Sequence, residues 1–133
     1  MITIGVIGYG YWGPNLVRNF AEAPGGRIGF VTDVRAERLT PVVARYPAAK
    51  VSTDYRELLR DPAVDAVAIA TPVSTHFDLA MAALRAGKHV LVEKPMTATS
   101  EQALALIDEA AKRGLVLMVD HTFVYTDAVR KIR

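Results

Sequence analysis

The sequence predicts an α/β fold, a doubly wound parallel sheet of about six strands in a single domain. Short apolar runs alternate with helical patterns along the chain, which is typical of a parallel sheet. The first run ends in a glycine-rich loop that opens a helix, and the second ends in an acidic residue. Polar and glycine-rich residues follow the apolar runs, and ligands bind at these carboxyl ends of the strands in such sheets.

Six apolar runs are predicted to be strands. They cover residues 2–7, 28–33, 50–52, 65–70, 89–93 and 115–119. The fourth run, "DAVAIA", is apolar almost throughout, as expected for a strand that helices cover on both faces.

The segments between these runs have helical patterns. Residues 36–46 place apolar side chains three and four positions apart, with Val43 expected on the buried side and a kink or a preceding turn at Pro41. Ser74 or Thr75 is expected to cap the next long helix.

The last long helix is predicted over residues 100–113, where apolar residues recur with the helical period and Gly114 provides a stop. Its predicted buried stripe consists of Ala103, Leu106, Ile107, Ala110 and Ala111.

The composition is that of an ordinary soluble globular domain, with 51% apolar and 23% charged residues in 133. The net charge is +2, but basic and acidic residues are interspersed, so we expect no nucleic-acid binding. There are no cysteines, and the His, Asp and Glu residues show no metal-ligand spacing. No leader peptide or membrane-spanning run is recognisable, so we expect a cytoplasmic protein without membrane contact.

The motif "GYGYWG" after the first strand matches a dinucleotide-binding turn. In such a turn Gly8 permits the sharp bend, Gly10 lets the backbone approach a pyrophosphate, and Gly13 lets the helix pack closely on the strand. Pro14 suits the first turn of that helix. The free N–H groups and the dipole of the helix then favour phosphate.

Asp33 follows Gly13 by 20 residues and ends the second strand, where a carboxylate accepts hydrogen bonds from the adenosine ribose. The alternative is a structural turn followed by a surface aspartate. Strand, glycine loop, helix and acid together favour the cofactor interpretation. The acid predicts NAD, with NADP disfavoured because a carboxylate repels a 2′-phosphate, and Arg35 weakens that preference without reversing it.

Glu93 and Lys94 follow an apolar strand and precede a proline, so both are expected to project from a strand end into the crevice. A lysine there can hydrogen-bond a carbinol oxygen, stabilise the alkoxide that develops during hydride transfer, or act as an acid or base. The alternative is a surface Glu–Lys pair, and position alone leaves the two interpretations balanced.

Several motifs together resemble a known family. "GYGYWG", "DV" after the second strand, "ATPVSTH" and "AGKHVLVEKP" occur in order over residues 1–120. They resemble the N-terminal domain of the Gfo/Idh/MocA oxidoreductases, the glucose–fructose oxidoreductase and inositol dehydrogenase family. "AGKHVLVEKP" is the specific motif, whereas the glycine loop is shared with many dinucleotide enzymes.

The resemblance implies roles for the motif residues. Lys94 would be catalytic and reach the reacting carbon, and the family's Lys–Pro bond, here Lys94–Pro95, is often cis. The cofactor would contact Gly8, Gly10, Tyr11, Trp12, Gly13, Asp33, Thr71, Pro72, His76, Glu93 and Lys94.

Two histidines have alternative interpretations. His76 is expected to flank the cofactor, or else to be a first-turn helix residue near solvent. His121 lies past the last strand, where family members carry residues near nicotinamide and substrate, and is otherwise a hinge residue.

Family members continue into a second domain that binds substrate, often forms the homo-oligomer interface and supplies an acid/base histidine. We therefore expect residues 1–120 to form the dinucleotide-binding domain and residues 121–133 to begin a linking helix, in a truncated chain that binds cofactor but is inactive alone. The full enzyme would move a hydride between NAD and a secondary alcohol of a sugar, cyclitol or sugar nucleotide. The alternative is a non-enzymatic NAD-binding sensor or partner subunit.

Overall fold

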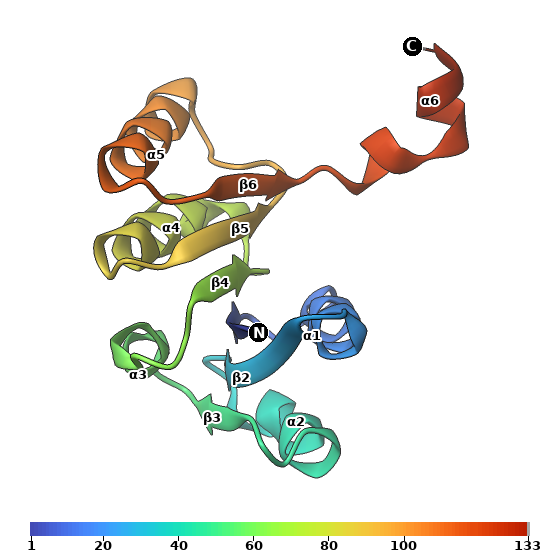
Figure 1. Ribbon diagram of the computed structural model, residues 1–133, viewed down its shortest axis with the longest axis vertical. Coiled ribbons are helices and arrows are strands. Elements are labelled where there is room, and N and C mark those ends of the chain that lie inside the picture. Colours follow the sequence, from blue (N-terminus) through green and yellow to red (C-terminus); the bar gives the residue numbers. More distant parts are fainter. Residues whose placement is uncertain (133) are drawn as a thin grey trace.

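Six parallel strands form the sheet of the computed structural model, which describes residues 1–132 (Figure 1). Their order is β3–β2–β1–β4–β5–β6. The sheet grows in one direction from β1 to β3 and in the other from β4 to β6, as in a doubly wound fold. The predicted fold class is confirmed. The strands are β1 (Ile2–Ile7), β2 (Gly26–Thr32), β3 (Lys50–Ser52), β4 (Ala66–Ile69), β5 (His89–Glu93) and β6 (Leu117–Asp120).

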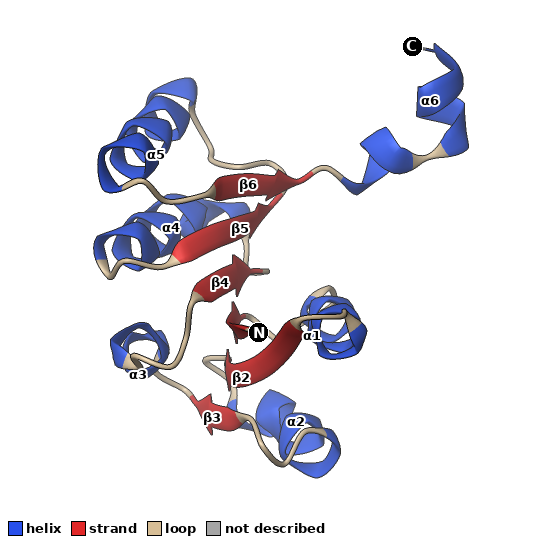
Figure 2. Ribbon diagram, in the orientation of Figure 1, coloured by secondary structure: helices blue, strands red, loops and turns tan. Residues whose placement is uncertain are grey.

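Helices cover both faces of the sheet (Figure 2). One layer contains α1 and α2, and the other contains α3, α4 and α5. The α-helices are α1 (Gly13–Glu22), α2 (Thr40–Arg45), α3 (Tyr55–Arg60), α4 (His76–Arg85), α5 (Ser100–Arg113) and α6 (Asp127–Ile132). Three 3₁₀ turns precede helices, namely η1 (Ala36–Leu39), η2 (Val73–Thr75) and η3 (Thr122–Tyr125). No helix within residues 1–132 combines the length and hydrophobicity needed to cross a membrane.

Each helical layer encloses its own apolar core. Leu58, Leu84 and Leu106 are fully buried beneath α3, α4 and α5, against side chains of β4 and β5. On the opposite face, Val17 of α1 and Val42 of α2 are fully buried against β1 and β2. Because both faces are packed, the strands are held rigidly, and so are the residues at their carboxyl ends.

The structure corrects one predicted detail of the helices and refines another. Val42 rather than Val43 is buried in α2, because the 3₁₀ turn before the helix places Val42 three residues after buried Leu39 on the same face. Thr75 is the N-cap residue of α4, as predicted, but its side chain makes no capping hydrogen bond. The Thr75 hydroxyl instead donates within the η2 turn, toward Thr71 Oγ1 and Pro72 O, both at 2.7 Å.

The buried stripe predicted for α5 is narrower than expected. Leu106 and Ala110 are buried, whereas Ala111 is exposed and Ile107 is 51% exposed. The helix packs against α4 and the edge strand β6, so it buries only a narrow line of side chains.

The chain leaves the sheet after β6. In Figure 1, η3 and α6 extend away from both helical layers. Phe123, Tyr125 and Ile132 in this segment are exposed.

The narrow contact of α5 leads to a stability prediction. Leu106→Ala is expected to lower the free energy of unfolding by about 2–5 kcal/mol, because it leaves a cavity at a fully buried position. Ile107→Ala, on the exposed neighbouring position, should cost less than about 1 kcal/mol. Urea unfolding of the two variants measures the difference, and equal losses would contradict the observed orientation of α5.

Candidate functional site

A crevice of about 1020 Å³ opens at the carboxyl ends of β1, β2, β4 and β5. Its volume reaches the upper end of the range for ligand and cofactor sites, roughly 300–1,000 Å³. Nine of the predicted site residues line it, namely Gly8, Gly10, Tyr11, Trp12, Asp33, Thr71, Pro72, Glu93 and Lys94. Three predicted site residues, Gly13, His76 and His121, are not among the residues that form its wall.

The glycine turn forms the floor of the crevice by bringing backbone segments into contact. Gly8 has a φ of +98°, and a Cβ there would lie 2.6 Å from the carbonyl oxygen of Ala70 at the end of β4. A Cβ at Gly13, which is buried at the start of α1, would collide with the carbonyl oxygen of Gly8. Gly13 therefore acts by allowing α1 to approach β1 rather than by facing the crevice.

The start of α1 faces the middle of the crevice. Tyr11 is 94% exposed and Trp12 is 36% exposed, and both line the wall beside Gly10. In this fully described helix, the first turn holds no acidic residue. The positive end of the helix dipole is therefore not neutralised locally, which favours an anionic group at this point.

Asp33 stands at one end of the crevice and is held firmly. Its carboxylate is 6% exposed, and the backbone N–H groups of Tyr9 and Arg35 donate to its two oxygens at 2.8 and 2.9 Å. Arg38 Nη1 lies 3.4 Å from Asp33 Oδ2. Each carboxylate oxygen accepts more than one hydrogen bond, so Asp33 keeps capacity for the hydroxyl groups of a ligand.

Glu93 and Lys94 lie at the opposite end of the crevice, where β5 ends. Glu93 is paired in register with Asp120 of β6. Burial raises the pKa of Glu93 from an ordinary 4.5 to about 7. A side-chain hydrogen bond with Asp120 and the charge of that residue add to the rise, and the N–H group and charge of Lys94 oppose it. The Lys94–Pro95 peptide bond is cis, as expected from the resemblance.

His76 has neither a cofactor-facing position nor a place near solvent. It is 1% exposed, with Nδ1 2.8 Å from Pro95 O and Nε2 2.8 Å from Thr71 O. Because the ring lies between these two carbonyl groups, it connects the loop after β4 with the loop after β5. His76 therefore positions Thr71 and the Lys94–Pro95 segment from beneath the crevice.

The remaining histidine expected in the site lies outside it. His121 is exposed beyond β6, and its backbone N–H donates to Val119 O at 2.9 Å. Lys88, within the specific motif, is also remote: its ammonium group is buried and donates to the carbonyl groups of Asp61 and Val64 at 2.8 and 2.7 Å.

Two residues of this region were missed by the sequence analysis. Arg38 lines the crevice from η1, five residues after Asp33, and its position one turn beyond the acidic strand end was a usable signal. Asp120 ends the last strand, as Glu93 ends the strand before it. Their pairing follows only from the adjacency of β5 and β6.

Comparisons with known proteins agree with this geometry. The model of the Gfo/Idh/MocA family, described as an oxidoreductase family with an NAD-binding Rossmann fold, matches residues 2–121. The oxidoreductase YdgJ of Escherichia coli K12 is 40% identical over 121 residues, covering 90% of this chain and 34% of the relative. The NAD⁺-dependent scyllo-inositol 2-dehydrogenase of Bacillus subtilis is 35% identical over 136 residues, covering 99% of this chain and 39% of the relative.

A solved structure shows the same architecture. It is that of KijD10, a 3-ketoreductase from Actinomadura kijaniata in complex with NADP and TDP-benzene. The TM-score is 0.91 at 32% sequence identity, over 98% of this chain and 40% of KijD10. The chain thus spans about a third to two fifths of the length of these relatives.

The buried position of His76 leads to a prediction. His76→Ala should lower the free energy of unfolding by about 2–4 kcal/mol, because it removes the ring between two carbonyl groups and leaves a cavity. His121→Ala is the control and should change it by less than about 0.5 kcal/mol, since that side chain is exposed. Chemical denaturation measures both, and equal midpoints would argue against a positioning role for His76.

Proposed function

Because the chain belongs to the Gfo/Idh/MocA oxidoreductases through their NAD-binding Rossmann domain, we propose that it forms the cofactor half of an NAD-dependent dehydrogenase. The enzyme would transfer a hydride between nicotinamide and a secondary alcohol of a sugar, cyclitol or sugar nucleotide. Residues 1–120 would bind the dinucleotide, and residues 121–133 would begin the link to a substrate domain.

The order of chemical groups along the crevice carries this proposal. A fixed carboxylate, Asp33, stands at one end, the glycine turn and the start of α1 occupy the middle, and Lys94 lies at the other end. These groups match a ribose, a pyrophosphate and a reacting carbon in that sequence. A Cβ at Gly8 or Gly13 would collide with the backbone of Ala70 or Gly8, so these glycines allow the tight turn that brings the start of α1 to the crevice.

Lys94 would take part in the reaction itself, beside the bound nicotinamide. Bound nicotinamide supplies the carbon that accepts or donates the hydride. Lys94 would donate a hydrogen bond to the oxygen of the reacting alcohol and stabilise the negative charge that develops on it. A histidine of the substrate domain would exchange the hydroxyl proton, so the present chain would bind cofactor without turnover. Full-length relatives are expected to be homo-oligomers.

The preference for NAD rests on Asp33, and Arg38 modifies it. The carboxylate would accept hydrogen bonds from the two hydroxyls of the adenosine ribose, and would repel a 2′-phosphate. Arg38, 3.4 Å from Asp33 and on the crevice wall, would offer a partner to that phosphate. We therefore propose that NAD is preferred and that Arg38 supports residual NADP binding. The relatives fit this view, since one is named for NAD⁺ and KijD10 was solved with NADP.

Cofactor titration tests the proposal directly. Trp12, the only tryptophan, lines the crevice, so its fluorescence should report binding. NADH should bind more tightly than NADPH. Asp33→Asn should weaken NADH binding by about tenfold or more, because hydrogen bonds to a charged group are lost.

The arginine provides the matched comparison. Arg38→Leu should weaken NADPH binding by about tenfold and leave NADH binding nearly unchanged. Arg45→Leu is the control, since Arg45 lies at the end of α2 over the Tyr46 ring and outside the crevice wall. A folded chain that binds neither dinucleotide would refute the proposed function.

A further inference from the structure

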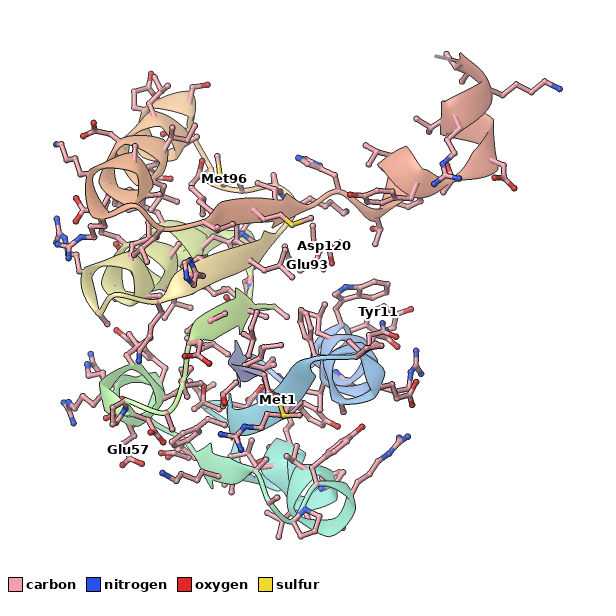
Figure 3. All side chains as sticks on the ribbon, viewed as in Figure 1. Met1, Tyr11, Glu57, Glu93, Met96 and Asp120 are labelled. Atoms are coloured by element: carbon pink, nitrogen blue, oxygen red, sulfur yellow. The ribbon has the colours of Figure 1, made fainter. Side chains whose placement is uncertain are left out.

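Two carboxyl groups lie next to each other at the Lys94 end of the crevice, and Glu93 is the one that lines its wall. Glu93 and Asp120 end neighbouring strands and are paired in register. Figure 3 shows their side chains next to each other, on the side of β5 and β6 that faces the loop carrying Tyr11. Glu93 also lines the crevice beside Lys94. Glu93 therefore belongs to the wall of the proposed cofactor site, and Asp120 lies beside it at the end of the neighbouring strand.

The local hydrogen bonding favours one proton between the two acids. Glu93 Oε2 accepts from the Lys94 N–H group at 3.3 Å. Glu93 Oε1 is buried and has no hydrogen-bond donor within the described residues 1–132. Two ionised carboxylates are both acceptors only, so a hydrogen bond between them requires a proton. A proton shared with Asp120 satisfies the buried oxygen and removes one of two like charges.

The charge of the Glu93–Asp120 pair would act on the nicotinamide ring, the part of the cofactor whose charge differs between the oxidised and reduced forms. Asp33 marks the adenosine end, so the other half of a dinucleotide lies toward β4 and β5. The nicotinamide ring is cationic when oxidised and neutral when reduced, whereas the phosphates and the adenosine are the same in both forms. A second negative charge on the acid pair therefore stabilises the oxidised cofactor more than the reduced one.

We propose that Glu93 and Asp120 act together as a charge sensor for the nicotinamide, holding one shared proton with the reduced cofactor and releasing it to solvent when the oxidised cofactor is bound. The inference rests on the proposed function, because it needs a bound dinucleotide. In this proposal, Asp120 helps the site to distinguish the oxidised from the reduced dinucleotide.

Other charged groups lie near the pair, and variants separate their effects from those of Glu93 and Asp120. Lys94 adjoins Glu93 on β5, His121 adjoins Asp120, and α4 contributes His76, at Pro95 O, and Asp78 on the crevice wall. Titration of a group that does not sense the ring charge changes the affinity for both redox states equally. It therefore cancels in the ratio of the two dissociation constants.

The test is a pair of titrations of the 133-residue chain with NAD⁺ and NADH at pH 6 and pH 8. The ratio Kd(NAD⁺)/Kd(NADH) should fall on the order of tenfold as the pH rises, the size of the interaction between unit charges about 10 Å apart at an effective dielectric constant near 20. Calorimetry near pH 7, in two buffers of different ionisation enthalpy, should show proton release with NAD⁺ and little with NADH.

Substitutions test whether the pH dependence of the Kd ratio comes from Glu93 and Asp120. Glu93→Gln should make the ratio independent of pH in this range. Asp120→Asn should move the transition to lower pH, because the negative charge of Asp120 no longer holds the proton while burial of Glu93 persists. Asp108→Asn is the matched control, since Asp108 pairs with Lys112 on the exposed side of α5.

Two results would overturn the inference. One is saturable binding of both redox states with a ratio that does not change between pH 6 and 8. The other is a pH dependence that Glu93→Gln retains and His121→Gln abolishes, which would assign it to the histidine. The absence of any dinucleotide binding would instead refute the proposed function, so the two failures are distinguishable.

Discussion

The contact between backbone segments at the β1–α1 turn is the constraint on which the crevice depends. Gly13 packs on the carbonyl oxygen of Gly8, and Gly8 packs on Ala70 at the end of β4. Three elements thus meet with no side chain between them. Because α1 comes this close to β1, its positive end points into the space between β1 and β4, and the strand ends on either side become the two walls of that space.

The carboxyl groups at the two ends of the crevice differ in how firmly hydrogen bonds hold them. Asp33 is fixed by two backbone N–H groups and approached by Arg38, so its charge is compensated and its orientation constant. Glu93 is next to a second acid and a lysine, and its pKa is raised to about 7. The carboxylate at one end is therefore fixed in orientation, and the carboxyl group at the other end responds to pH near neutrality.

The features that depend on residues adjacent in the chain could be predicted from the sequence. The contacts between residues that are distant in the chain could not. The six strands and the turn at Gly8 follow from residues that are adjacent in the chain, and they were predicted correctly. The burial of Val42 instead of Val43 depends on a 3₁₀ turn, which has a shorter period than the helix assumed. The contacts of His76 and Asp120 could not be predicted because their partners, Pro95 and Glu93, are brought to them only by the folded sheet.

The two ends of the crevice come from separate stretches of chain, and this separation has an evolutionary consequence. The end that holds Asp33 is formed by residues 8–38, and the opposite wall is formed by residues 70–94 with a contribution from the segment after β6. A mutation at Glu93 or Lys94 is separated from Asp33, because β1 and β4 lie between the end of β5 and the end of β2. The residues at one end of the crevice can thus diversify while selection preserves those at the other end.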